Sequence, residues 1–133
     1  MKAELIDTNI ILRYLTADVP KQALQSRNLF QQVLDGKVSV EIPLLVLAET
    51  LWTLVKFYRQ PKKEAVESLV IIVKTPGIHI QDKKLILDAL ELYNNSNISF
   101  TDAYLVITSR SHDCGIFSFD RDFDHFGVKR KEP

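Results

Sequence analysis

Apolar residues follow two different spacings along this chain, and the spacings separate helices from strands. Stretches in which apolar positions recur every three or four residues indicate amphipathic helices. Short apolar runs, or apolar residues that alternate with polar ones as at Val38, Val40 and Ile42, indicate strands. The predicted strands are residues 3–6, 38–42, 78–80 and 115–119. The predicted helices are residues 9–15, 20–34, 44–58, 63–74, 83–93 and 99–112.

Capping residues mark the ends of several of these segments. Asp18 is the expected N-cap of the second helix, because Pro20 follows it at a position where a first helical turn tolerates proline. Asp82 and Ser99 are expected to cap the last two helices. Residues 120–126 are predicted to form a polar turn that carries aromatic side chains.

The order of these elements predicts the fold class. Strands alternate with helices, and a strand–helix–strand connection is right-handed and brings its two strands together in parallel. We therefore predict an α/β fold, a three-layer α/β/α sandwich with a mainly parallel central sheet. A chain of 133 residues has the size of one folded unit, so residues 1–133 are expected to form a single domain.

Composition excludes several classes of protein. Apolar residues make up 46% of the chain and charged residues 26%, which is typical of a globular domain and not of a disordered one. No apolar run is long enough to span a membrane, and a carboxylate interrupts the N-terminus before a signal peptide could form. The single cysteine, Cys114, cannot form an internal disulfide, so a cytoplasmic location is expected.

The charge balance argues against long-range attraction to nucleic acid. Lys and Arg together number 17, as do Asp and Glu, so the formal net charge is zero. Short basic runs occur at residues 62–63, 83–84 and 129–131, and each is interpreted as a solvated face or tail. A nucleic-acid enzyme stays open as an interpretation if its grip on phosphate is local or comes through metal ions.

Four acidic residues from distant parts of the chain fall at one edge of the predicted sheet. Asp7 and Asp120 directly follow the first and last predicted strands, and the carboxyl ends of parallel strands share an edge. Asp102 lies near the start of a helix, and Glu49 lies early in the helix after the second strand. Helix starts face the same edge, so the topology is expected to gather all four carboxylates there.

Each acid also has a structural interpretation. Asp7 and Asp120 suit a helix cap and a turn, respectively. Asp102 stands three residues after Ser99, as in a capping box. Glu49 is different, because its helix is apolar on nearly all sides and no Lys or Arg stands three or four residues away. We expect Glu49 to be largely buried, at an energetic cost that a bound cation or another partner would remove.

A cluster of carboxylates suits a hard divalent cation. Converging carboxylates repel one another, and Mg²⁺ and Mn²⁺ bind oxygen ligands together with water. Such a site suits phosphodiester hydrolysis, because the bound cation lowers the pKa of water and stabilises charge on phosphate oxygens. A zinc site is poorly supported, since Cys114 and the histidines show no ligand spacing. The histidines are His79, His112 and His125.

At these residues the chain resembles the PIN domain family, in particular the small VapC-like toxins of bacterial and archaeal toxin–antitoxin pairs. The resemblance covers essentially the whole chain, and the order and positions of its four fragments make it specific. The fragments are Asp7-Thr8-Asn9 with Ile10-Ile11-Leu12-Arg13-Tyr14-Leu15 after it, Leu47-Ala48-Glu49-Thr50-Leu51, Phe100-Thr101-Asp102-Ala103 and Phe119-Asp120-Arg121-Asp122-Phe123.

The resemblance implies an endoribonuclease of PIN fold that uses Mg²⁺ or Mn²⁺ to hydrolyse single-stranded RNA. It further implies a homodimer and a small antitoxin protein as partner. The family's catalytic and metal-binding acids map onto Asp7, Glu49, Asp102 and Asp120, with Asp122 as an auxiliary metal ligand. Candidates for hydrogen bonds that orient the carboxylates are Thr8, Asn9 and Ser118. Arg13 and Arg121 are interpreted either as phosphate contacts or as surface arginines.

Two other functional interpretations share features with this sequence. A haloacid-dehalogenase-type phosphatase also places Asp after its first strand, but it needs a second acid two residues later, where Asn9 stands. A PIN-like module that binds RNA or a protein without cutting is the alternative from a different class. The intact set of four acids argues against that module.

Overall fold

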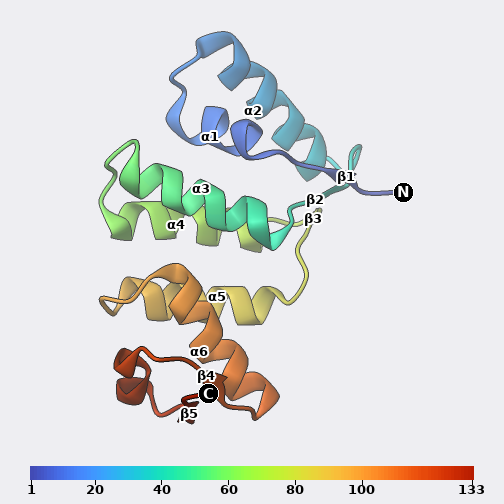
Figure 1. The fold of residues 1–133 in the computed structure, drawn as a ribbon. Helices are drawn as coiled ribbons and strands as arrows, with labels where there is room; N and C mark the ends of the chain where they lie inside the picture. Colours follow the sequence, from blue (N-terminus) through green and yellow to red (C-terminus); the bar gives the residue numbers. More distant parts are fainter. The chain divides into compact units, whose positions relative to one another are not determined.

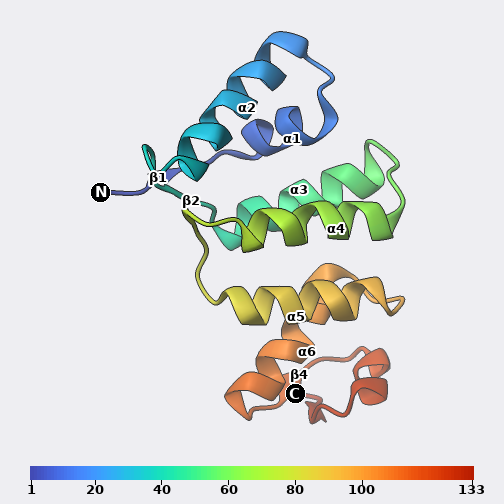
Figure 2. The same ribbon diagram turned by 180° about the vertical axis from the view of Figure 1, so that it is seen from behind.

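The computed structural model describes residues 1–133, and the chain divides into two units, Met1–Gln81 and Asp82–Pro133. Figures 1 and 2 show the ribbon from opposite sides, coloured along the sequence. Both units contain parallel strands and helices.

The first unit is built on a three-stranded parallel sheet in the order β1-β2-β3. Its strands are β1 (Glu4–Leu5), β2 (Val40–Glu41) and β3 (Ile78–His79). Its helices are α1 (Thr8–Thr16), α2 (Pro20–Leu34), α3 (Leu44–Lys56) and α4 (Lys62–Lys74). Two helices connect each pair of neighbouring strands, and α1 packs on α2 as α3 packs on α4 (Figure 1). The carboxyl ends of all three strands consequently lie at one edge.

The helices of this unit bury the faces that their apolar spacing predicts. In α3, Leu47, Leu51 and Leu54 stand four and three residues apart, and each is at most 2% exposed. In α4, Leu69 and Val73 repeat the four-residue step and are equally buried. Burying one such side chain contributes about 2 kcal/mol, so helix packing dominates the stability of a unit whose strands are only two residues long.

A cluster of hydrogen bonds ties the α1–α2 turn to the end of α3. The Arg13 guanidinium donates to Gln22 (2.9 Å), Asp18 (3.3 Å) and the Tyr58 hydroxyl oxygen (3.4 Å). Asp18 also accepts from the Tyr58 hydroxyl (2.7 Å) and from the Thr16 hydroxyl (2.9 Å). The hydrogen bonds from Tyr58 and Thr16, aided by the positive charge of Arg13, hold the pKa of Asp18 below its ordinary value.

This cluster corrects the prediction that Asp18 caps the second helix. The N-cap of α2 is Val19, which makes no capping hydrogen bond, and Pro20 fills the first turn. The carboxylate of Asp18 is engaged by Tyr58, which lies 40 residues away in the sequence. Local sequence cannot reveal that Tyr58 competes with the helix for the Asp18 carboxylate. The position of Pro20, in contrast, predicted the start of the helix correctly.

The second unit packs two helices beside a two-stranded parallel ladder. Its elements are α5 (Lys83–Asn94), α6 (Phe100–His112), β4 (Ile116–Phe117), the 3₁₀ helix η1 (Arg121–Phe126) and β5 (Arg130–Lys131). One apolar cluster of this unit is formed by Val106 of α6, Ile116 of β4 and Phe123 of η1. Gly115 permits the close approach of β4 and β5, because a Cβ atom there would lie 2.6 Å from the Lys129 carbonyl oxygen.

The α/β class with a parallel sheet is confirmed, and all six predicted helices are present within a few residues of their expected bounds. The four predicted strands are present but shorter, and they belong to two separate ladders. Ser99 caps α6 as expected, whereas Asp82 stands at the start of α5 in a left-handed conformation without a side-chain capping bond. No helix combines the length and apolar character that crossing a membrane requires.

The interpretation of residues 129–131 as a solvated face or tail is wrong for Arg130, whereas Lys129 and Lys131 are exposed. Arg130 and Lys131 form β5, and the Arg130 side chain is only 14% exposed. A two-residue strand of charged residues shows no apolar alternation, so sequence spacing gives no signal for it. Its position is set by partners elsewhere in the second unit, chiefly β4 and Asp124.

We expect Tyr58→Phe to lower the melting temperature by a few degrees near neutral pH, because the change removes the hydroxyl that donates to Asp18. The folded pKa of Asp18 is depressed, so its contribution to stability is present above the ordinary value of 3.8 and is lost as pH falls through the folded value. The difference between variant and wild type should therefore shrink below about pH 4. Thermal melts across this range measure it.

The matched control is Tyr14→Phe, because the Tyr14 hydroxyl makes no hydrogen bond and its ring packs on Phe30 with centroids 4.5 Å apart. We expect this control to melt like the wild type at every pH. A Tyr58→Phe variant that melts like the wild type, or a difference that grows in acid, would contradict the role given to the cluster.

Candidate functional site

Asp7 lies at the carboxyl end of β1, where it caps α1. Its Oδ1 atom accepts a hydrogen bond of 2.8 Å from the Thr8 backbone N–H. The side chain is exposed, and its second oxygen makes no hydrogen bond within the protein. Thr8 is buried and contributes its backbone to Asp7, whereas Asn9 lines a shallow depression between α1 and α2. Asp7 is thus oriented by the backbone with one oxygen left for a ligand.

Glu49 lies in the second turn of α3, and its side chain is exposed on the first unit. The prediction that it is buried is wrong. The helix is apolar on nearly all sides, but only the face with Leu47, Leu51 and Leu54 is buried, whereas Leu45 and Trp52 are exposed like Glu49. The burial cost expected of an unpaired Glu49 is therefore absent, and its solvated carboxylate forms no ion pair.

In the first unit, Asp7 and Glu49 lie in segments that follow two neighbouring parallel strands. Leu5 of β1 pairs with Glu41 of β2, and Asp7 follows two residues after Leu5. The helix that carries Glu49 begins at Leu44, three residues after Glu41, and it contacts α1. Both residues therefore lie on elements that leave the same edge of the sheet.

Asp102 lies in the first turn of α6. Its backbone N–H donates to the Ser99 side-chain oxygen at 3.1 Å. The reciprocal hydrogen bond of a capping box, from the Ser99 N–H to the Asp102 side chain, is absent. The half-buried Asp102 carboxylate therefore makes no hydrogen bond within the protein.

Asp120 lies three residues beyond β4 and caps η1. Its Oδ1 atom accepts a 2.9 Å hydrogen bond from the Asp122 backbone N–H, and its own N–H donates to the Ser118 hydroxyl oxygen at 3.0 Å. Ser118, predicted as a supporting residue, thus binds the backbone of Asp120 and not its carboxylate. Asp122 is exposed, and its backbone N–H serves the Asp120 cap.

In the second unit, Asp102 lies in the first turn of α6 and Asp120 follows β4. A short turn at residues 113–115 reverses the chain between α6 and β4, which contact each other. The start of α6 and the carboxyl end of β4 both lie away from this turn. Of the four candidate acids, Asp7 and Glu49 belong to the first unit and Asp102 and Asp120 to the second.

The charge environment leaves these four carboxylates unpaired. The four ion pairs of the structure involve other acids, which are Asp18, Asp88, Asp124 and Glu132. Within either unit, no group of three potential metal-ligating side chains converges. Carboxylates with free oxygens are the donors that Mg²⁺ and Mn²⁺ prefer, so the chemistry of the donor set fits such an ion.

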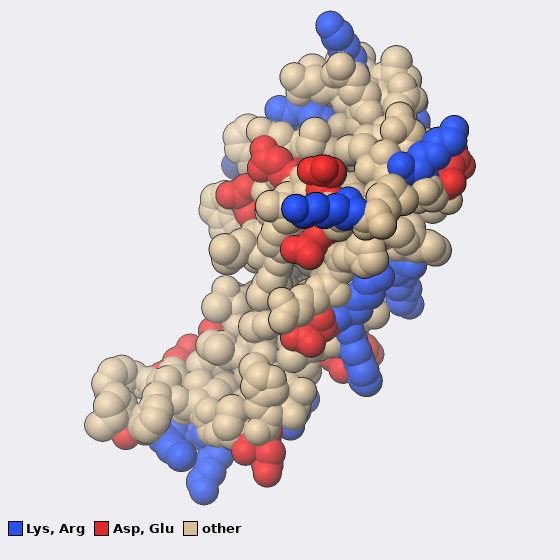
Figure 3. Space-filling model, turned by 90° about the vertical axis from the view of Figure 1, so that its right-hand side faces the viewer, with Lys and Arg blue, Asp and Glu red and all other residues tan.

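Basic residues do not dominate the face of the molecule that Figure 3 shows. Lys and Arg are interspersed with Asp and Glu on the face shown in Figure 3. Arg13, one of the two arginines considered for phosphate, is engaged by Asp18 and Tyr58, so it acts in the structure of the first unit. Arg121 is exposed beside Asp120 and stays a candidate for phosphate contact.

Two residues that sequence reasoning missed lie close to Asp120. Arg130 of β5 donates to both carboxylate oxygens of Asp124 in η1, at 2.9 and 3.4 Å. These hydrogen bonds and the adjacent positive charge hold the pKa of Asp124 below its ordinary value. Arg130 lies in a charged run without apolar spacing, and no local pattern connects it with Asp124 six residues earlier, so the pairing has no signal in the sequence.

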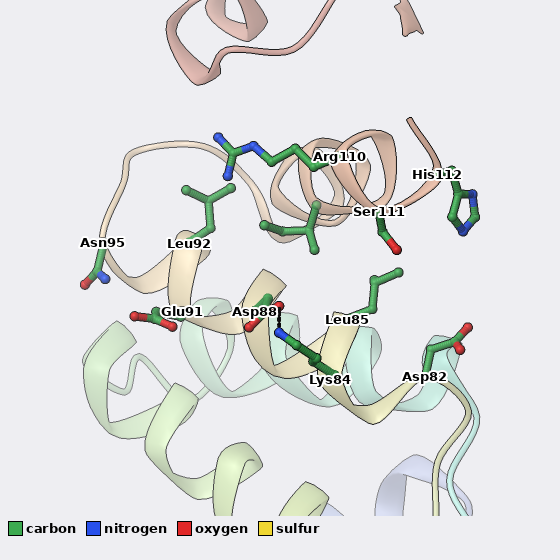
Figure 4. Close-up of a pocket in the computed structure, with 11 residues that line it drawn as sticks. Asp82, Lys84, Leu85, Asp88, Glu91, Leu92, Asn95, Arg110, Ser111 and His112 are labelled. Atoms are coloured by element: carbon green, nitrogen blue, oxygen red, sulfur yellow. Dashed lines mark hydrogen bonds and ion pairs between the residues drawn. The ribbon is translucent and has the colours of Figure 1, made fainter. Parts of the chain in front are cut away.

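The hollow between α5 and α6 is distinct from the candidate acids. It has a volume of about 760 Å³ and is lined by residues of the second unit, including Asp88, Leu92 and Arg110. Figure 4 shows these side chains around the groove, with Lys84 bonded to Asp88 on its α5 side. None of the predicted site residues lines it, and its charged groups are of both signs.

Comparison with known proteins gives one family match. A family model described as PIN domain matches residues 5–129. No curated protein matches the sequence significantly. Among solved structures, the chain is similar to the crystal structure of VapC20 of Mycobacterium tuberculosis, described as a sarcin-ricin loop cleaving toxin. The identity is 20% and the TM-score 0.42, over 98% of this chain and 100% of that one.

We expect Ser99→Ala to destabilise the protein by about 1 kcal/mol, because the Asp102 N–H loses its acceptor at the start of α6. Ser99→Asp should retain most of the stability, since Asp caps helices as well as Ser does. Chemical denaturation followed by circular dichroism measures both. The control is Ser111→Ala on the same helix, where the serine is exposed and makes no hydrogen bond. Equal losses for Ser99→Ala and Ser111→Ala would show that the cap contributes nothing.

Proposed function

Since this chain belongs to the PIN domain family, we propose that it is a metal-dependent endoribonuclease that hydrolyses phosphodiester bonds of single-stranded RNA. PIN domains are typically metal-dependent nucleases and generally use divalent metals. The observation that carries the proposal is that the family match spans residues 5–129 and so includes every candidate acid. The free carboxylate oxygens of these acids support it.

The proposed metal ligands are the same four carboxylates that act in catalysis. They are Asp7, Glu49, Asp102 and Asp120, and Asp122 is proposed as an auxiliary ligand. When bound, Mg²⁺ or Mn²⁺ would lower the pKa of water and stabilise negative charge on the phosphate oxygens. Hydrolysis by water needs no protein nucleophile, so the role of the protein is to hold in place the carboxylate oxygens that bind the metal.

Backbone groups perform much of that task. The Thr8 N–H fixes Oδ1 of Asp7 and leaves Oδ2 free, and the Asp122 N–H does the same for Asp120. Ser118 adds a second constraint by accepting from the Asp120 N–H. Such supporting hydrogen bonds keep a ligand oriented when the metal is absent, which lowers the cost of ordering it on binding. Asn9 is proposed as a further supporting residue.

The proposal extends to partners. We propose that the chain acts as the toxin of a toxin–antitoxin pair, that a small antitoxin protein neutralises it, and that it forms a homodimer. These features rest on the resemblance of its motifs to VapC-like toxins. The alternative is a PIN-like module that binds RNA or protein without cutting, and the experiments below separate the two.

We expect Asp7→Asn, Glu49→Gln, Asp102→Asn and Asp120→Asn each to reduce cleavage of single-stranded RNA by about a hundredfold or more, because each removes a negative metal ligand while keeping the shape of the side chain. Asp7→Asn should fold normally, since Asn is as good an N-cap as Asp. Single-turnover cleavage of a labelled RNA in Mn²⁺ measures the effect.

The matched control for these variants is Asp88→Asn. Asp88 is a surface residue of α5 that pairs with Lys84 at 3.0 Å and belongs to none of the proposed ligands. Cleavage by the control should equal that of the wild type. Cleavage that survives in any of the four ligand variants would remove that residue from the proposed mechanism.

Removal of divalent ions should abolish cleavage, and added Mn²⁺ should restore it. The physical reason is that the unpaired carboxylates repel phosphate unless a cation neutralises them. The measurement compares RNA cleavage in EDTA with cleavage after Mn²⁺ is supplied in excess. Cleavage that is indifferent to EDTA would contradict a metal mechanism, and RNA binding without cleavage in Mn²⁺ would favour the non-cutting module.

A further inference from the structure

We propose that Arg130 is a positioning residue that fixes the turn carrying Asp120, and this inference rests on the proposed function. Arg130 lies in β5, ten residues after Asp120 in the sequence. It belongs to none of the motif fragments that pointed to the site. Its side chain is partly buried, with 14% of it exposed, and its guanidinium bonds to the segment between β4 and the end of η1.

The guanidinium uses all three of its nitrogen atoms. Nε and Nη2 donate to the two carboxylate oxygens of Asp124, at 2.9 and 3.4 Å. Nη1 donates to the Ser118 carbonyl oxygen at 3.1 Å and to Glu132 at 3.0 Å. The planar fork of arginine matches a carboxylate in this bidentate way, and lysine has no equivalent geometry.

These contacts hold the Asp120 turn from both sides. Ser118 precedes Asp120 by two residues and Asp124 follows it by four, and Arg130 binds both. Inside this span, the Asp120 N–H donates to the Ser118 hydroxyl oxygen and the Asp122 N–H donates to Asp120 Oδ1. The orientation of the Asp120 carboxylate therefore depends on the distance that Arg130 maintains between Ser118 and Asp124.

Other contacts near the turn are limited. The β4–β5 ladder has two residues in each strand, and it reaches the turn through the Ser118 N–H, which donates to the Lys131 carbonyl oxygen at 2.9 Å. Phe123 anchors η1 in the core, and Arg110 donates to the Phe126 carbonyl oxygen at its far end. None of these contacts replaces a link from Ser118 to Asp124 across Asp120.

The first experiment measures amide hydrogen exchange in the metal-free full chain. Arg130→Gln should speed exchange of the Asp120 and Asp122 amides about tenfold, because a charge-assisted clamp is lost. The Asp102 amide, bonded to Ser99 in the same unit, should keep its rate. The matched control is Lys129→Gln, which removes a neighbouring positive charge that makes no hydrogen bond. Unchanged exchange at Asp120 in Arg130→Gln, or equal acceleration at Asp102, would overturn the proposal.

The second experiment measures Mn²⁺ affinity by isothermal titration calorimetry. Arg130→Gln should weaken Mn²⁺ binding about tenfold, as loss of a group that orients a metal ligand typically does. In a chain that already carries Asp120→Asn, Arg130→Gln should weaken binding no further, because the ligand that it positions is gone. Arg130→Lys keeps the charge without the fork and should lie between wild type and Arg130→Gln.

The outcomes separate this inference from the proposed function. If Asp120→Asn weakens Mn²⁺ binding and Arg130→Gln does not, the proposed ligand stands and the role of Arg130 is overturned. Equal weakening by Arg130→Gln in both backgrounds overturns it as well, because the effect then bypasses Asp120. If Asp120→Asn leaves Mn²⁺ binding unchanged, the proposed metal ligand is wrong, and the positioning role of Arg130 falls with it.

Discussion

Unpaired N–H groups at helix starts orient two of the four candidate carboxylates, those of Asp7 and Asp120. The first turn of a helix has N–H groups without partners inside the helix. Asp7 accepts one at the start of α1, and Asp120 accepts one at the start of η1. At the start of α6, Ser99 takes the Asp102 N–H and leaves the Asp102 carboxylate free. Capping and metal binding are therefore compatible, because a carboxylate has two oxygen atoms.

Most of the fold was predictable from local spacing, because the helices bury one face of each apolar pattern. The positions of the strands were predicted correctly, but their lengths were not. A strand ends where its neighbour no longer offers hydrogen-bond partners, and an apolar run can continue beyond that point. Glu49 shows where prediction from apolar spacing fails. Its helix is apolar on nearly all sides, so spacing alone cannot say which face is buried, and the exposed face proved to carry Leu45, Glu49 and Trp52.

The order of the sequence motifs identifies the candidate ligands, whereas the hydrogen-bond partners around them are visible only in the structure. Asp18 and Arg130 show why. Each is held by partners that no local rule connects, Tyr58 in one case and Ser118 with Asp124 in the other. Sequence reasoning assigned Asp18 to a helix cap and Arg130 to a solvated run, and both assignments failed because each side chain bonds to residues in other segments of the chain. The contacts that the sequence did not predict are those that join different helices and strands.

The way this chain uses its arginines bears on how an RNA would approach the proposed site. Positive and negative side chains balance, and Arg13 and Arg130 are already engaged by Asp18 and Asp124. The chain therefore has little net field to attract a polyanion, and unpaired carboxylates repel phosphate at short range. In the proposed nuclease a divalent cation would reverse the local charge at these carboxylates. In the proposed nuclease, the carboxylates would hold an ion that both binds the substrate phosphate and activates water, which would let a chain of zero net charge act on RNA.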